Sequence, residues 1–213
     1  MKQRIFNLII TDESGSMSSI RQLAINSVNE TLQTIRSAQQ KHEEQEHFVT
    51  LVTFNDDVKI INECDAVDKV AELNEKTYIP DCCTALYDAI GVSVNKLRKS
   101  VSEEDKVLVT IVTDGCENAS REWSGKAIKS LIEEMREKGW VFAYIGANHD
   151  IESAAAAISI SNTLKFECNE QGVEAMSKHV HACRSYWYDR VANNEANSEK
   201  DNKGFFDKLK DFL

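Results

Sequence analysis

Ile9-Ile10-Thr11-Asp12-Glu13-Ser14-Gly15-Ser16-Met17 is the stretch of this 213-residue chain from which its fold and chemistry are best predicted. The apolar run over residues 5–10 ends abruptly in small oxygen-bearing side chains, with Asp12, Ser14 and Ser16 spaced two residues apart. Ligands of open α/β sheets bind beyond the carboxyl ends of the strands. A buried strand over 5–10 would therefore present these three side chains at a binding edge. One carboxylate and two hydroxyls suit a small, hard cation such as Mg²⁺, which prefers oxygen ligands and keeps several waters.

A helix cap is the plainer interpretation of the same stretch, because Ser and Asp are preferred N-cap residues. A helical period does begin after Ser16, with apolar residues at Ile25, Val28, Leu32 and Ile35. Taken alone, the stretch favours the cap. The rest of the chain reverses that preference.

Apolar runs alternate with helical periods along the chain, which predicts a mostly parallel sheet covered by helices on both faces. The runs over 48–54 and 58–61 are joined by about three residues, whereas a parallel return needs about a dozen, so this pair is antiparallel. The prediction is an α/β, Rossmann-like, doubly wound sheet of six strands with one antiparallel edge strand. The expected strands cover 5–10, 48–54, 58–61, 107–112, 141–145 and 164–168, and the expected helices cover 18–41, 67–73, 85–97, 128–139, 151–158 and 172–191.

Composition narrows the class of protein. A hydrophobic fraction of 42% suits one sizeable core, and a net charge of −10 argues against nucleic acid or an anionic membrane as the main partner. The first apolar run is too short for a membrane span or a signal-peptide core. Six scattered cysteines in a chain of this length indicate reduced thiols, and hence a cytoplasmic protein.

The composition changes near the C-terminus, which divides the chain into three predicted parts. Residues 1–192 form the α/β domain, and 193–203, with almost no apolar residue, form a flexible polar linker. In the last part, 204–213, Phe205, Leu209 and Phe212 fall on one helical face. This amphipathic segment either folds back on its own domain or self-associates, which we favour, or it serves as a docking peptide for a partner.

Two later loops also offer oxygen ligands at element boundaries. Thr84 precedes the helix that opens at Ala85, and Asp114 follows the strand over 107–112. Because the carboxyl ends of parallel strands meet at one edge of a sheet, these residues are expected to join Asp12, Ser14 and Ser16. The predicted metal ligands are thus Asp12, Ser14, Ser16, Thr84 and Asp114.

The motif set Asp-x-Ser-x-Ser, then Thr84-Ala85-Leu86-Tyr87-Asp88-Ala89-Ile90, then Thr113-Asp114-Gly115, resembles that of von Willebrand factor A domains over roughly residues 5–191. It matches their metal-ion-dependent adhesion site (MIDAS), and the chain looks like a small intracellular, bacterial-type member. The resemblance implies that Ser14 and Ser16 bind the cation directly, and that Thr84 binds it directly or through water. Asp12 and Asp114 would act mainly through bridging waters. The cation would be Mg²⁺, with Mn²⁺ or Ca²⁺ as alternatives.

The function that this resemblance implies is a metal-dependent protein–protein interaction module rather than an enzyme. A cation with few direct carboxylate ligands attracts an Asp or Glu from a partner protein. The alternative is a metal-dependent, phosphatase-like hydrolase with Asp12 as nucleophile. Such hydrolases place a second carboxylate two residues on, where this chain has Ser14.

Several other residues near these motifs need an interpretation. Cys82, Cys83 and Cys116 are interpreted as small, semi-apolar fillers, with a redox-sensitive or soft-metal site as the alternative. Glu13 is assigned no role. His179 and Cys183, four residues apart, could share a helix face, but no third metal ligand is evident.

Overall fold

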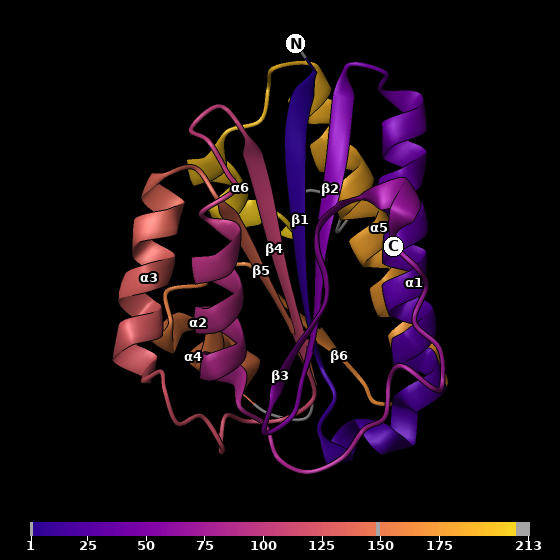
Figure 1. Ribbon diagram of the computed structural model, residues 1–213, viewed down its shortest axis with the longest axis vertical. Helices are drawn as coiled ribbons and strands as arrows, with labels where there is room; N and C mark the ends of the chain where they lie inside the picture. The colour runs from indigo at the N-terminus through magenta and orange to yellow at the C-terminus, as the bar shows by residue number, and fades with distance from the viewer. Residues whose placement is uncertain (1, 148–149, 208–213) are drawn as a thin grey trace.

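A single six-stranded sheet in the order β3-β2-β1-β4-β5-β6 runs through the molecule. The computed structural model describes residues 2–147 and 150–207, and Figure 1 shows β1 near the middle of the sheet. All neighbouring strands are parallel except β2 and β3, so the predicted fold class is confirmed. The strands are β1 (Gln3–Asp12), β2 (Gln45–Phe54), β3 (Val58–Ala66), β4 (Lys106–Thr113), β5 (Val141–Ala147) and β6 (Thr163–Phe166).

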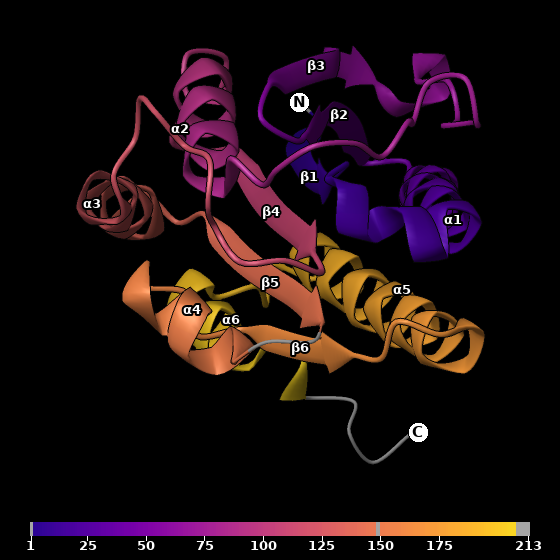
Figure 2. The ribbon, with the colours of Figure 1, turned by 90° about the horizontal axis from the view of Figure 1, so that it is seen from below.

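Helices cover both faces of this sheet, as Figure 2 shows in end view. Helices α1 (Arg21–Lys41) and α5 (Glu170–Ala192) lie on one face, and α2 (Leu86–Leu97), α3 (Gly125–Glu137) and α4 (Ile151–Ala157) lie on the other. Side chains of β1 alternate between the two layers: Ile9 packs with α1 and α5, whereas Leu8 and Ile10 pack with α2 and α3. Burial on both faces explains why β1 is an almost continuous apolar run.

Two predicted helices differ from the observed ones. The helix expected over 18–41 opens as a 3-10 helix, η1 (Gly15–Ile20), before α1 begins. The helix expected over 67–73 is only the short η2 (Val67–Lys69). The chain beyond η2 stays irregular because α1 holds its backbone: Asn29 exchanges two hydrogen bonds with the backbone of Leu73, and Arg36 donates to the carbonyl of Val70.

The predicted flexible linker over 193–203 is wrong, because helix α6 (Ser198–Gly204) takes up its second half and packs beside β5. The short strand β6 pairs with β5 only at residues 144–147, which leaves the backbone of Trp140 and Phe142 without a strand partner on that side. The buried side chain of Asn202 accepts from Phe142 N (3.0 Å) and donates to Trp140 O (2.7 Å). The polar composition predicted a flexible linker, but the polar side chain of Asn202 instead provides hydrogen bonds to buried backbone groups.

The predicted amphipathic segment over 204–213 is described only in part. Phe205 and Phe206 are buried in the same core cluster as α1 and α5. Leu209, Phe212 and the rest of 208–213 lie outside the described residues, so docking of the whole segment stays a prediction. In the part of the chain that the structure describes, no helix combines the length and the apolar character that crossing a membrane requires.

Replacing Asn202 by Ala should lower the free energy of unfolding by about 2–4 kcal/mol, because two buried backbone groups lose their partners. Urea unfolding followed by circular dichroism measures the loss. Lys203→Ala is the matched control: the described partner of the exposed Lys203 ammonium is exposed Glu199, so this change should stay within about 0.5 kcal/mol. Equal stability of Asn202→Ala and wild type would contradict the role of α6.

Candidate metal centre

The carboxyl ends of β1 and β4 bring two of the oxygen-bearing loops together. Ser16 Oγ donates to Asp114 Oδ1 at 2.6 Å, and Ser14 Oγ lies 3.1 Å from Ser16 Oγ. The backbone N–H of Ser14 donates to Asp12 Oδ1 at 2.7 Å. Four of the five predicted ligands thus form one continuous hydrogen-bonded set, although Asp12 and Asp114 lie 102 positions apart in the sequence.

Thr84, the fifth predicted ligand, lies beside Gly115, on the side where a larger residue would carry its Cβ atom. A Cβ atom added to Gly115 would lie 3.2 Å from Thr84 Oγ1 and 3.9 Å from both Asp12 Oδ2 and Ser16 Oγ. Oxygens from two segments, the loop of Asp12 and Ser16 and the segment of Thr84, therefore surround the position where a larger side chain would intrude. The structure brings all five predicted residues together, and Gly115 keeps the space between them free.

Burial controls the charge of this centre. Asp12 is fully buried (0% exposed), and this desolvation raises the pKa of its carboxyl. Hydrogen bonds from Thr113 and Ser14 act in the opposite direction, while the nearby charge of Asp114 raises the pKa further. A cation between the two carboxylates would relieve both the desolvation and the repulsion.

The donor chemistry fits a hard cation. Over residues 2–147 and 150–207, no group of three or more His, Cys, Asp or Glu side chains could hold a metal ion. At this centre the donors are two carboxylates and the hydroxyls of Ser14, Ser16 and Thr84, so serine and threonine must supply much of the coordination. Oxygen-only sets of this kind favour Mg²⁺, Mn²⁺ or Ca²⁺ over thiophilic metals.

Sequence reasoning missed two residues that hold Asp12. Thr113 Oγ1 donates to Asp12 Oδ2 at 2.5 Å, and the hydroxyl of buried Tyr78 donates to Asp12 O at 2.5 Å. Thr113 belongs to the motif Thr113-Asp114-Gly115, so its place in the sequence could have indicated its role. Nothing in the sequence indicated the role of Tyr78, because only the fold brings it to the end of β1.

Glu13, to which sequence analysis assigned no role, fastens the segment that leads to Thr84. We call residues 78–83 the strap. The buried carboxylate of Glu13 accepts from the backbone N–H of Ile79 at 2.5 Å and pairs with Lys59 Nζ at 3.2 Å. The carbonyl of Glu13 accepts from Asp81 N at 3.0 Å, and Gly15 N donates to Cys82 O at 3.1 Å. The strap is therefore tied along its length to the loop of Asp12.

Acidic side chains also join the loop after β4 to the start of α2. Glu117 accepts from the backbone N–H of Tyr87 at 2.9 Å, which provides α2 with a cap that its own N-cap residue, Ala85, cannot supply. Asp88 in turn accepts from three backbone N–H groups of the loop, those of Arg121, Glu122 and Trp123. These carboxylates are structural and do not point to further ligands.

The interpretation of Cys82, Cys83 and Cys116 as fillers is wrong, because all three thiols are exposed. Hydrogen bonds to Asp56 and Cys83 raise the pKa of Cys82 to about 11, so this thiol stays protonated at neutral pH and is a poor metal ligand. His179 and Cys183 do not form a metal pair either: His179 Nε2 lies 3.1 Å from Phe206 O, and Cys183 is buried in the core.

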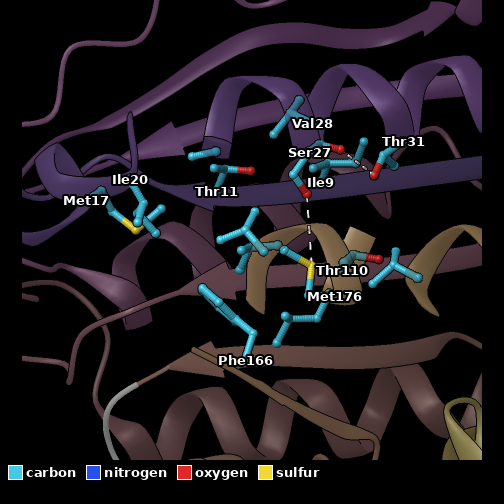
Figure 3. A pocket seen from close by; sticks show the side chains of 15 residues that line it. Ile9, Thr11, Met17, Ile20, Ser27, Val28, Thr31, Thr110, Phe166 and Met176 are labelled. Carbon is cyan, nitrogen blue, oxygen red and sulfur yellow. Dashed lines mark hydrogen bonds between the residues drawn. The ribbon is translucent and has the colours of Figure 1, made fainter. Parts of the chain in front are cut away.

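A small cavity of about 20 Å³ lies beneath the centre, between α1, α5 and the sheet (Figure 3). Thr11 lines it, one residue before Asp12, and Ile9 and Met176 contribute apolar wall. Thr11 Oγ1 is buried and has no hydrogen-bond partner among the described residues. The cavity has room for about one water molecule, which would satisfy this hydroxyl.

The sheet is doubly wound, and the loops after β1 and β4 bring Ser, Thr and Asp side chains together at its edge. These two features define a class of α/β binding domain. A family model for the von Willebrand factor type A domain matches residues 8–177, and the chain belongs to this family. Domains of this family are generally protein-interaction modules, mostly without enzymatic activity, and some bind a metal ion at a MIDAS.

Solved structures with the same fold are distant in sequence. A mutant of the PilB minor pilin from Streptococcus sanguinis matches with a TM-score of 0.64 and 14% identity, over 92% of this chain and 64% of the pilin. A von Willebrand factor type A protein from Catenulispora acidiphila matches with a TM-score of 0.56 and 10% identity, over 88% and 43%.

A third similar structure carries a metal. Proximal thread matrix protein 1 from the mussel byssus, with a zinc-occupied MIDAS, matches with a TM-score of 0.57 and 16% identity, over 86% of this chain and 46% of that protein. The chain thus spans between 43% and 64% of these three structures, which share its fold. No curated protein matches it in sequence.

Asp12→Asn tests whether the buried carboxyl of Asp12 is the group whose ionisation costs stability when no metal is bound. Because the folded-state pKa of Asp12 is raised, the stability that its protonated form contributes is lost as the pH rises through that pKa. The amide can replace the carboxylate, since Thr113 Oγ1 can donate instead to Gly115 O at 3.1 Å. In chelator, wild type should therefore lose more stability than Asp12→Asn between about pH 4 and about pH 7.

Urea unfolding of both proteins at the two pH values measures this difference. Parallel pH profiles for wild type and Asp12→Asn would show that Asp12 is not the titrating group.

Proposed function

We propose that the chain is a metal-dependent protein–protein interaction module whose MIDAS binds a divalent cation, Mg²⁺ in the first place and Mn²⁺ or Ca²⁺ as alternatives. Ser14, Ser16 and Thr84 would hold the ion, and Asp12 and Asp114 would orient hydroxyls and waters around it. The observation that carries the proposal is the convergence of these five residues on the space beside Gly115. The zinc-occupied MIDAS of the mussel protein supports a divalent ion in this fold.

The partner would present an Asp or Glu side chain to the ion. The hydroxyls of Ser14, Ser16 and Thr84 are neutral, and Asp12 and Asp114 would act mainly through waters, so a bound divalent cation would keep an open position that a carboxylate can bind. Without the ion, the carboxylates of Asp12 and Asp114 would repel such a partner, as would the net charge of −10. The ion would therefore cancel the charge of these two carboxylates and offer a ligand position to the partner, so that recognition depends on the metal.

Hydrolase chemistry is less well supported by the same geometry. A nucleophilic carboxylate must reach its substrate, yet Asp12 is 0% exposed, and its two oxygens accept from Ser14 N and Thr113 Oγ1. We therefore propose a non-enzymatic role. The exposed thiols of Cys82, Cys83 and Cys116 suit a reducing compartment, so we also propose that the chain is a cytoplasmic, bacterial-type member of the family.

Mg²⁺ should raise the melting temperature of the wild type relative to chelator, because a ligand that binds only the folded state stabilises it. Ser14→Ala combined with Ser16→Ala should weaken Mg²⁺ binding at least about tenfold and remove most of this gain. Thermal unfolding and calorimetry measure both effects. Ser18→Ala, an exposed serine of the same 3-10 helix, is the matched control and should behave as wild type.

Partner recognition is tested by pulldown from the native cell with Mg²⁺ or with chelator, using wild type and the variant with Asp12→Ala and Ser14→Ala. We expect a partner that is retained only by the wild type with Mg²⁺. A partner held equally in all conditions would count against the module, and Mg²⁺-dependent turnover of a phosphomonoester would favour the hydrolase instead.

A further inference from the structure

Thr84 lies in an irregular segment, between the strap and α2, so no strand ladder and no helix determines its position. Its backbone is held instead by a single residue of another loop. Thr84 N donates to Asn118 Oδ1 at 2.9 Å, and Asn118 N donates to Thr84 O at 3.0 Å. Both hydrogen bonds use the backbone of Thr84, which leaves its hydroxyl available to a cation.

Asn118 belongs to the loop that carries Asp114, four residues further along. The bonds of Glu117 to Tyr87 and of Asp88 to the backbone of 121–123 hold this loop against α2. The paired bonds of Asn118 therefore join the segment of Thr84 to the loop of Asp114. Because Thr84 Oγ1 lies 3.2 Å from the Cβ position of Gly115, a relative shift of the two segments would change the distances among the oxygens.

We propose that Asn118 is a positioning residue of the metal centre, which holds Thr84 Oγ1 beside the Asp114–Gly115 turn without contacting the ion. This inference rests on the proposed function and deepens it. Asn118 itself is exposed, but Thr84 is buried at 3% exposed, so removal of the Asn118 side chain also costs some stability through the unpaired Thr84 N. What depends on Asn118 is the geometry of the hydroxyl.

The test is a double-mutant cycle on Mg²⁺ affinity, measured by calorimetry for wild type, Asn118→Ala, Thr84→Val and the double variant. Asn118→Ala removes one of the two bonds and keeps the backbone one, so we expect Mg²⁺ to bind about 3- to 10-fold more weakly. In the Thr84→Val background, which lacks the hydroxyl, Asn118→Ala should cause no further loss, because Asn118 acts through that hydroxyl.

Two controls separate positioning from general loosening. Asn118→Asp keeps the oxygen that accepts from Thr84 N, so it should bind Mg²⁺ at least as tightly as wild type. Asn74→Ala removes a comparable side-chain bond to Lys76 N (2.9 Å), away from the centre, and should leave the affinity unchanged. Thr84 is buried and Lys76 is exposed, so Asn118→Ala should lower the melting temperature in chelator at least as much as Asn74→Ala, and the Thr84→Val background separates that general loss from positioning.

The outcomes distinguish the two proposals. If wild type binds Mg²⁺ while Asn118→Ala binds it equally well, or if its loss persists on Thr84→Val, Asn118 has no positioning role and the metal centre stands. If wild type binds neither Mg²⁺ nor Mn²⁺, the metal centre is overturned, and the positioning role with it.

Discussion

The burial of Asp12 at the carboxyl end of β1 is the constraint on which the rest of the centre depends. A carboxylate without solvent contact needs donors, and the surrounding segments supply them: Ser14 N and Thr113 Oγ1 on its oxygens, and Tyr78 on its carbonyl. Each donor comes from a different segment, so satisfying Asp12 also places the η1 loop, the end of β4 and the strap. The hydrogen bonds that offset the desolvation of the Asp12 carboxylate are therefore the same contacts that assemble the centre.

Side chains, rather than strands or helices, hold the irregular segments around this centre. Glu13 accepts a hydrogen bond from the backbone of the strap, Asn118 accepts one from the backbone of Thr84, and Asp88 accepts one from the loop after β4. Asn202 does the same far from the centre, where it replaces the missing strand partner of β5. In each case one polar side chain forms hydrogen bonds with backbone groups that have no partner in a strand or helix. These bonds fix the positions of irregular segments without adding regular structure.

Such a centre is suited to recognition that depends on a metal. The carboxylates of Asp12 and Asp114 are close, and Asp12 is desolvated, so the centre without metal carries unfavourable charge. A divalent cation would stabilise the protein and create an electrophilic face in one event, which couples metal binding to partner binding. The hydroxyl-rich donor set would keep that face electrophilic, because Ser14, Ser16 and Thr84 add no negative charge of their own.

The sequence by itself determined the doubly wound sheet, the antiparallel edge and the five residues of the centre, because apolar periodicity and motif position are local properties of the chain. Only the tertiary structure decided the roles of Tyr78, Glu13 and Asn118, since each acts on a segment remote in sequence or on backbone atoms. It also decided that α6 begins at Ser198: a polar stretch is typical of a flexible linker, and only the fold shows which backbone groups its Asn202 amide satisfies. The composition of a segment indicates how much apolar surface it can bury, whereas its hydrogen-bond partners are known only from the packed structure.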